Sequence, residues 1–483
     1  MNATSTPRPR LPRSVCIPKG AKPVLLALCL FALWPPAVGR SQPAYRSVIV
    51  IQMDSLRADH LQPYGYGRAT SPNIAAFART ATVFEQVYPA ASWTRPSILA
   101  MLTGRYSSEL TTNIGGTAPI KDNQPTLASA MRAYGYATAA FYNTAQLDPK
   151  TANVQRDFDV FKDYGDASGK NVVRGHVRRG VDAALDFLRS THTPAFVYFH
   201  VLNPHHPYIP RQNFFGKTPV DKFRDSYSFA TGVPPYDPKE VQPCYLATNL
   251  AVVPQMMELY DSEIRIADAE IGRLLRFLDA EPRYRDALVI VTSDHGEEFA
   301  EHGGLYHGAR FYEESLRVPL IVRDTTRPFS AGRRVGSVVS LLDVAPTILS
   351  LAGIDYAPSD YSGQSLLPYF TRRGGRARDT AIIERPGCGY DATVAVRQGE
   401  WKMIIRLTRP RVELYDLRRD PAEKHDRARS ASPDVRRMYK ALYATFETWY
   451  RRVNRPLATR NGDDAPEIPD QLRARLRALG YLN

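Results

Sequence analysis

The sequence predicts an α/β protein in which helices flank a central, mostly parallel sheet. Three segments, at 47–53, 195–199 and 287–293, are continuous apolar runs. Such runs are typical of strands that are buried on both faces, as in parallel sheets. Between these segments the apolar residues recur with helical spacing, most clearly over 258–278. The alternation of strands and helices therefore favours a helix–sheet–helix sandwich.

The N-terminal residues 1–39 have the pattern of a secretory signal peptide. Five basic residues precede an 11-residue apolar run at 24–34, and a small-residue cleavage site follows at 37–39. The apolar run is shorter than the about 20 residues that a membrane-spanning helix needs. We therefore expect a secreted or periplasmic protein with no stable transmembrane segment after cleavage. The alternative is that the segment is retained as an N-terminal anchor.

The alternation of buried strands and helices ends after residue 372, and this change predicts two regions in the mature chain. A linker at 371–376 is followed by a hairpin pattern around Gly399, and a helical segment at 432–452 comes next. We expect a catalytic domain at 40–372 and a small C-terminal α+β subdomain with an antiparallel sheet at 373–483. The Pro-rich stretch at 203–254 lacks periodicity, which is typical of a loop that walls a substrate site.

Composition and charge exclude several classes of protein. The 483 residues are 43% hydrophobic and 23% charged, which excludes a disordered chain and a disulfide-dense mini-protein. The formal net charge of +14 falls to +9 without the five basic residues of 1–39. No nucleic-acid motif accompanies this charge, so we expect an anionic ester substrate or the anionic cell envelope as partner, and no nucleic acid. Cys244 and Cys388 remain after cleavage, and their spacing does not decide whether they pair.

Polar side chains follow three of the predicted strands. Asp54 follows the first strand, His200 follows the second, and Asp294 and His295 follow the strand at 287–293. A single Asp at such a place is often a helix N-cap. Because ligands bind beyond the carboxyl ends of parallel strands, three such strands together favour a metal site. Mixed carboxylate and imidazole ligands suit Zn²⁺ or Mn²⁺ better than Ca²⁺, which remains an alternative.

A short predicted helix places Thr94 near its positive end. Pro96 fits the first helical position and Gly104 fits the residue just past the end. A hydroxyl at a helix N-terminus lies where an oxyanion or phosphate binds. Coordination to a metal would make its alkoxide accessible as a nucleophile. The alternative is a plain N-cap Thr.

Together, the motifs of this chain resemble those of the sulfatase family of the alkaline phosphatase superfamily. The matching segments are 53–61, 64–66, 70–74, 94–104, 204–208, 260–268, 293–297, 301–308, 317–320, 342–347 and 413–417. The resemblance covers nearly the whole mature chain. It implies the alkaline-phosphatase/sulfatase-like sandwich and an enzyme that hydrolyses sulfuric or phosphoric ester bonds with a divalent metal ion.

The departures from the family pattern are equally informative. Typical sulfatases carry Cys or Ser at the nucleophile position, oxidised to formylglycine, whereas Thr94 cannot undergo this change, so we expect no formylglycine. His295 stands in place of the usual Asn and His307 in place of a Lys. Ser55 replaces a second Asp, and Ile98 replaces an Arg. The chain is similar to the Thr-nucleophile group, which includes phosphoethanolamine transferases and lipoteichoic acid synthases.

The resemblance assigns roles to individual residues. The expected metal ligands are Asp54, Thr94, Asp294 and His295. Thr94 attacks the phosphorus or sulfur atom in line, and His205 and His307 contact the ester or protonate the leaving oxygen. The expected substrate-binding residues are Arg95, His205, His302 and His307. Each of these three histidines has a structural alternative, and Asp59 is either a neighbour of the metal ligands or a helix cap.

Three functions fit these residues. The first is an exported hydrolase of a phosphate or sulfate ester, with a phosphoester or phosphodiester favoured. The second is a transferase that moves a phosphoryl-linked group onto an envelope glycan or lipid. The third is a non-catalytic sugar-binding relative, against which the intact set of predicted metal ligands argues.

Overall fold

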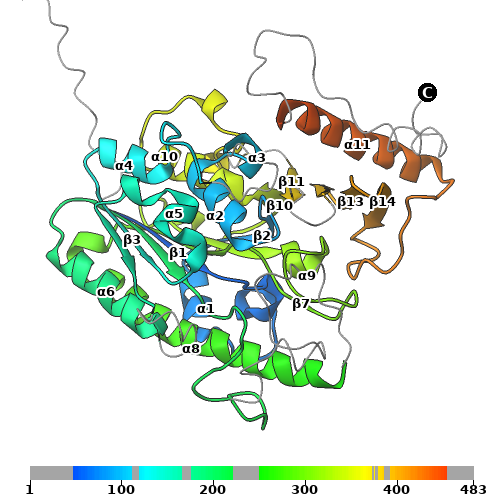
Figure 1. Ribbon diagram of the computed structural model, residues 1–483. Coiled ribbons are helices and arrows are strands. Elements are labelled where there is room, and N and C mark those ends of the chain that lie inside the picture. Colours follow the sequence, from blue (N-terminus) through cyan, green and yellow to red (C-terminus); the bar gives the residue numbers. More distant parts are fainter. Residues whose placement is uncertain are drawn as a thin grey trace, which may run out of the picture. The chain divides into compact units, whose positions relative to one another are not determined.

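An eight-stranded mixed sheet forms the centre of the structure, a computed structural model (Figure 1). It describes residues 47–110, 119–165, 176–220, 250–371, 375, 379–385 and 392–453. The strand order is β10-β2-β9-β6-β1-β5-β3-β4. Only β9 runs antiparallel to its neighbours within this sheet, so the predicted, mostly parallel sheet is confirmed.

The strands of this sheet are β1 (Ser47–Met53), β2 (Thr82–Tyr88), β3 (Ala137–Tyr142), β4 (Val160–Asp163), β5 (Ala195–Val201), β6 (Leu288–Ser293), β9 (Val318–Arg323) and β10 (Arg334–Ser340). The helices around it are α1 (Pro72–Ala78), α2 (Thr94–Thr103), α3 (Ser107–Leu110), α4 (Leu127–Ala133), α5 (Pro149–Ala152), α6 (His176–Ser190), α8 (Val253–Ala280), α9 (Glu313–Leu316) and α10 (Val344–Leu351). A short pair, β7 (Glu298–Phe299) and β8 (Leu305–Tyr306), forms a separate ribbon.

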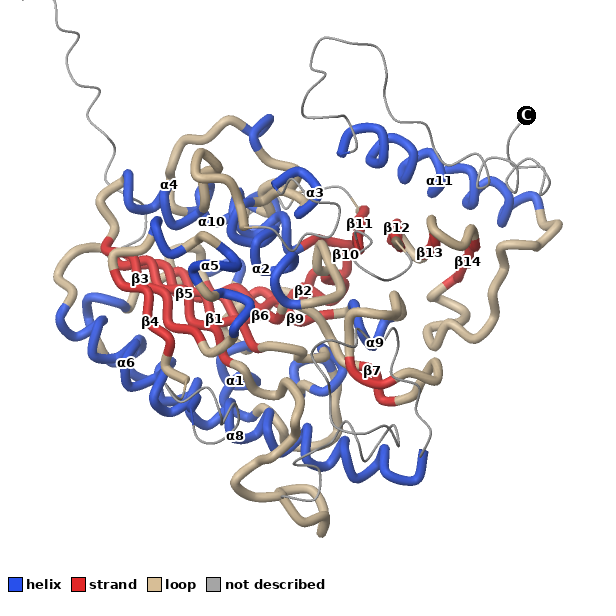
Figure 2. Tube along the Cα trace, in the orientation of Figure 1, coloured by secondary structure: helices blue, strands red, loops and turns tan. Residues whose placement is uncertain are grey.

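Helices cover both faces of the sheet (Figure 2). Ile49 and Ile51 of β1 pack in one core with α1, α6 and α8. Val48 and Val50 pack in a second core with α2, α4 and α10 on the opposite face. Because side chains alternate along a strand, a strand covered on both faces must be apolar throughout. This explains the continuous apolar runs of the sequence.

The C-terminal residues form a second, antiparallel sheet. Its strands are β11 (Thr380–Arg385), β12 (Thr393–Gln398), β13 (Trp401–Arg406) and β14 (Arg411–Asp416), and α11 (Pro433–Val453) packs against it. The predicted hairpin is confirmed: Gln398 pairs with Trp401, and Gly399 takes a positive φ of 55°. This sheet joins the first through Glu384, whose backbone N–H donates to the Ala90 carbonyl at 2.8 Å.

Several sequence predictions lie outside the described residues. These are the signal peptide at 1–39, both cysteines of the mature chain, much of the 203–254 loop and the last short helix. The boundary at 372 between the predicted domains remains a prediction. Within the part of the chain that the structure describes, no helix combines the length and the apolar character needed to cross a membrane.

Candidate active site

The carboxyl ends of three neighbouring strands bring the predicted metal ligands together. The parallel register sets Met53 of β1 beside Val201 of β5 and Ser293 of β6. Asp54 directly follows β1, and Asp294 follows β6. Strand β5 is longer than the sequence predicted, so His200 lies inside it rather than after it.

Asp54, Asp294 and His295 form a buried cluster. The His295 Nε2 atom lies 3.6 Å from Asp54 Oδ1 and 3.6 Å from Asp294 Oδ2. His200 extends the cluster, because its Nε2 lies 3.4 Å from Asp54 Oδ2. One ligand atom each from Asp54, Asp294 and His295 lie within 4.8 Å of one another. These three predicted ligands therefore converge on one point.

Backbone and hydroxyl groups fix the orientation of this cluster. His295 Nδ1 lies 2.9 Å from the Gly296 carbonyl. Because a carbonyl can only accept, Nδ1 carries the proton and Nε2 presents a lone pair to the carboxylates. Ser55 donates from its backbone N–H to Asp294 Oδ1 at 3.1 Å and from Oγ to Asp54 Oδ1 at 3.0 Å. It does so from the left-handed region, with φ 60°, as residues at functional sites sometimes do.

The electrostatics of the cluster fit a divalent cation. Burial and the charge of Asp54 together raise the pKa of Asp294 well above its ordinary value. Burial also raises the pKa of Asp54, but the neighbouring His205 and His200 outweigh it and hold that pKa below its usual range. Within the described residues, Asp294 Oδ2 and both ring nitrogens of His200 are buried without a hydrogen-bond partner. A cation would satisfy these atoms and the adjacent carboxylate charges.

Thr94 faces this cluster from the start of α2. Its Oγ1 lies 3.2 Å from His295 Nε2. The N-cap residue is Trp93, so the plain N-cap alternative for Thr94 does not hold, and Pro96 occupies the third helical position rather than the first. Gly104 ends the helix in the left-handed region with φ 64°, as predicted. Ser97 Oγ donates to the Asp294 carbonyl at 2.7 Å and thereby fastens α2 to the end of β6.

A second group of side chains lies on the same rim and consists of three histidines. The ring centroid of His307 lies 4.1 Å from that of His295 and 5.0 Å from that of His205. The rings of His205 and His206 stack at 4.3 Å. Burial lowers the pKa of all three imidazoles, most strongly for His206 and His307, whose neighbouring histidines add to the effect. The structure therefore brings the predicted His205 and His307 together with the metal cluster.

His302 does not join this group. Its Nδ1 lies 2.6 Å from Glu314 Oε1, its Nε2 lies 3.2 Å from the Glu423 carbonyl, and its ring stacks on Tyr312 at 3.6 Å. Both ring nitrogens thus contact protein groups, one in α9 and one in the segment after β14. These contacts favour the structural alternative for His302, and its substrate-binding role stays a prediction.

Two other predicted polar residues have identifiable surroundings. Asp59 forms an ion pair with Arg57, in which Nη2 of the arginine lies 2.8 Å from Asp59 Oδ2. Arg95 is half-buried, and its guanidinium lies 5.9 Å from the Trp93 ring centroid. Its position next to Thr94 at the start of α2 keeps it a candidate for contact with an anionic substrate.

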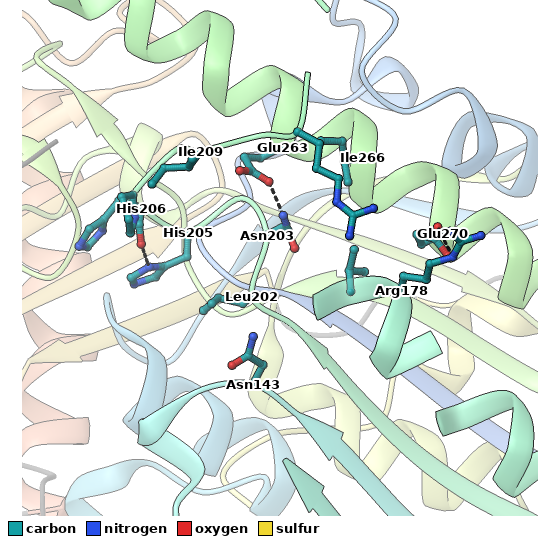
Figure 3. Close-up of a pocket in the computed structure, with 13 residues that line it drawn as sticks. Asn143, Arg178, Leu202, Asn203, His205, His206, Ile209, Glu263, Ile266 and Glu270 are labelled. Atoms are coloured by element: carbon teal, nitrogen blue, oxygen red, sulfur yellow. Dashed lines mark hydrogen bonds and ion pairs between the residues drawn. The ribbon is translucent and has the colours of Figure 1, made fainter. Parts of the chain in front are cut away.

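A hollow opens beside His205 and His206. Figure 3 shows Asn143, Asn203 and Glu263 around it, with Asn203 Nδ2 donating to Glu263 Oε2. Arg178 and Arg211 also line it and bring positive charge. Burial raises the pKa of Glu263 to about 7. The hollow therefore combines amide, carboxyl and guanidinium groups next to the histidines.

Three residues of the site were not among the predicted site residues. The sequence signal for His200 is its position as a polar residue at the end of an apolar strand. The structure adds its contact with Asp54. His206 was visible as the second member of a His–His pair. Glu297, whose Oε1 lies 2.8 Å from His307 Nδ1, was visible as the last residue of the matching segment 293–297.

Comparison with known proteins agrees with this geometry. The family model for sulfatases matches residues 46–354, and the model described as N-sulphoglucosamine sulphohydrolase, C-terminal, matches 300–448. The chain is 26% identical over 452 residues to the arylsulfatase K of Homo sapiens, covering 83% of this chain and 82% of that protein. It is 24% identical over 428 residues to the choline-sulfatase of Rhizobium meliloti (strain 1021), covering 78% of this chain and 81% of that protein.

Solved structures share the fold. A 2-O GAG sulfatase superposes with a TM-score of 0.68 at 18% identity, covering 85% of this chain and 92% of that chain. The phosphonate monoester hydrolase of Agrobacterium radiobacter superposes with a TM-score of 0.61 at 19% identity, covering 84% of this chain and 95% of that chain. The predicted sulfatase-like sandwich is confirmed. The sulfatase family model matches residues 46–354, which is more than half of the chain. This chain therefore belongs to the sulfatase family and is a hydrolase of sulfuric or phosphoric ester bonds.

Proposed function

We propose that this protein hydrolyses a phosphate or sulfate ester with Thr94 as nucleophile and a divalent cation held by Asp54, Asp294 and His295. The observation that carries the proposal is the 3.2 Å separation of Thr94 Oγ1 from His295 Nε2, beside a buried carboxylate oxygen without a hydrogen-bond partner among the described residues. A hydroxyl in this place is close enough to join the same ligand sphere. Export to the periplasm or the exterior, through residues 1–39, belongs to the proposal.

Different groups of the site have different roles in the proposed reaction. A bound cation supplies positive charge that favours the Thr94 alkoxide and offsets charge on the transferred group. Thr94 Oγ1 gives up its proton to water and attacks the phosphorus or sulfur in line, the bond to the ester oxygen breaks, and the leaving oxygen takes the bonding electron pair and a proton from water. The backbone N–H groups that begin α2 face the anionic oxygens. Water then cleaves the Thr94 adduct, releases phosphate or sulfate and returns the hydroxyl.

The hollow beside His205 supports a sugar ester as substrate. A relative in Bacteroides thetaiotaomicron is named an N-acetylglucosamine-6-O-sulfatase, and one structural neighbour was solved in complex with D-glucosamine-2-N,6-O-disulfate. Arg178 and Arg211 would attract the anionic groups of such a sugar. The relatives' names favour sulfate esters. Thr94 and the phosphonate monoester hydrolase neighbours favour phosphorus, and we retain a phosphoester as the preferred class.

The test is an activity panel of an aryl phosphate monoester, a phosphodiester and an aryl sulfate on metal-loaded protein. We expect Thr94→Ala to lower kcat/KM by at least roughly 1,000-fold, because the variant lacks the hydroxyl that attacks the ester from the start of α2. Thr94→Ser should retain part of the activity. Thr103→Ala, at the other end of the same helix, is the matched control. Unchanged turnover by Thr94→Ala would overturn the mechanism, and turnover of the sulfate alone would overturn the preference for phosphorus.

A transferase that modifies an envelope glycan or lipid uses the same first step. Adding an acceptor alcohol and analysing the products separates the two functions. A phosphorylated acceptor formed faster than free phosphate would favour the transferase.

A further inference from the structure

We propose that Arg385, the last residue of β11, is a positioning residue that holds the turn carrying His307 in place relative to the start of α2, where Thr94 lies. The inference rests on the proposed function and deepens it, because both segments belong to the site described above. Arg385 belongs to the C-terminal sheet. The proposal therefore makes that sheet a requirement for turnover as well as for stability.

The end of β11 lies beside the segment that leads to the nucleophile. Ala91 and Glu384 form a parallel β-bridge, and the Glu384 N–H donates to the Ala90 carbonyl at 2.8 Å. Helix α2 begins shortly after this bridge, at Thr94. The backbone itself therefore holds Arg385, the residue after Glu384, next to the segment that begins α2.

The Arg385 side chain binds the turn that carries His307. Its Nη1 donates to the Gly308 carbonyl at 2.5 Å, and the same carbonyl accepts from Ser92 Oγ at 3.3 Å. Gly308 also packs close to Trp93, because a Cβ atom at this glycine would lie 3.7 Å from the Trp93 Cβ. One carbonyl oxygen, directly after His307, thus joins β11 to the segment that begins α2.

The segment after β14 holds the other end of the same ribbon. Lys424 Nζ donates to the Glu301 carbonyl, and His302 Nε2 lies 3.2 Å from the Glu423 carbonyl. The segment 301–308, which contains β8, is therefore anchored at both ends by groups that follow the first sheet in the chain. The anchor that lies next to the catalytic groups is Arg385.

The chemistry of Arg385 suits this role. Its guanidinium is charged at any pH at which proteins fold, and a charge-assisted hydrogen bond is stronger than one between neutral groups. The residue is 6% exposed, and its Nη1 donates to the Gly308 carbonyl, so we expect it to act through this carbonyl rather than on the ester. A displacement of about 1 Å between reacting groups can lower a rate about 100-fold. The competing interpretation is that Arg385 only stabilises the junction of the two sheets.

A double-mutant cycle between Arg385 and His307 separates positioning from stability. On the ester that the wild type turns over fastest, we expect Arg385→Met to lower kcat/KM by roughly 10- to 100-fold, because His307 is no longer held at a fixed distance from Thr94. His307→Ala alone should lower it at least as much. Added to His307→Ala, Arg385→Met should cost less than about threefold more, since no imidazole is left to position. Losses that multiply in the double variant overturn the proposal, as does a fully active His307→Ala protein.

Arg385→Lys serves in case Arg385→Met does not fold. Lysine keeps the buried charge but replaces the planar fork by a single ammonium group, so we expect wild-type circular dichroism and a loss in kcat/KM of roughly 3- to 10-fold that again requires His307. Wild-type turnover by folded Arg385→Lys protein overturns the proposal. The matched control is Arg411→Met, which changes an exposed arginine of β14 and should stay within about twofold of wild type.

The Thr94→Ala variant distinguishes the failure of this inference from the failure of the proposed function. A large loss by Thr94→Ala, together with losses at Arg385 and His307 that multiply, would remove the positioning role and leave the function standing. Unchanged turnover by Thr94→Ala would remove the proposed function and, with it, the role of Arg385.

Discussion

His302 shows at the scale of one residue that neighbouring motif histidines can have different roles. It lies five residues before His307, yet its ring is held between Glu314 and Tyr312. Burial lowers the pKa of His302, but the hydrogen bond to Glu314 outweighs it and leaves this pKa above its ordinary value. A protonated imidazole that is paired with a carboxylate stabilises the fold.

Replacing His302 by Gln should therefore lower stability and leave turnover within about twofold of wild type. The ion pair contributes stability below the ordinary pKa of histidine, and this contribution is lost as the pH rises through the raised pKa of the folded state. We expect a loss of roughly 1–3 kcal/mol at pH 5.5 and a smaller loss at pH 9. Urea unfolding at the two pH values measures it. A large fall in kcat/KM with unchanged stability would restore the substrate-binding role.

At the scale of elements, Glu384 joins strand β11 to the segment between β2 and α2 and to α3. Its side chain accepts from the Ser108 backbone N–H at 2.9 Å and from Ser108 Oγ at 2.6 Å. The residue is 2% exposed, and burial raises its pKa to about 7. Strand β11 of the C-terminal sheet and α3 thus meet at a buried carboxyl group that is protonated at acidic pH.

This contact predicts a pH-dependent stability. Because the pKa of Glu384 is higher in the folded than in the unfolded state, its protonation stabilises the fold below about pH 4.5, and this stability is lost as the pH rises to about 7. The loss is at most about 3 kcal/mol. Glu384→Gln should lack it, so the variant gains stability relative to wild type between pH 5 and pH 8 in urea titrations. Exposed Glu400→Gln is the control, and an equal pH slope for wild type and Glu384→Gln would contradict the expectation.

At the scale of the whole molecule, a buried ion cluster fastens the C-terminal sheet to the catalytic part. Lys402 of β13 is fully buried, and its Nζ lies 3.1 Å from Glu313 Oε1 of α9 and 2.9 Å from Glu423 Oε1. Burial lowers the pKa of Lys402, but the two carboxylates outweigh it and raise this pKa. The lysine is therefore charged and holds two segments that are more than a hundred residues apart in the chain.

Removing this charge should destabilise both sheets together. Lys402→Met leaves two buried carboxylates without their cation, and we expect a loss of about 3–5 kcal/mol in the free energy of unfolding. Lys440→Met, which changes an exposed lysine of α11, should have little effect. Denaturant unfolding followed by tryptophan fluorescence and circular dichroism measures both. A Lys402→Met protein within about 1 kcal/mol of wild type would show that the cluster does not hold the sheets together.

The sequence by itself determined the family and the sandwich, and it predicted that Asp54, Asp294 and His295 lie close together. These predictions succeeded because a buried strand leaves a local signal and its carboxyl end directs the next residue toward the common rim. Only the tertiary structure decided the antiparallel direction of β9, the contact of His302 with Glu314 and the meeting of His206 with His307. Such contacts join residues far apart in the chain through irregular turns, where no periodicity records which side chain faces which partner.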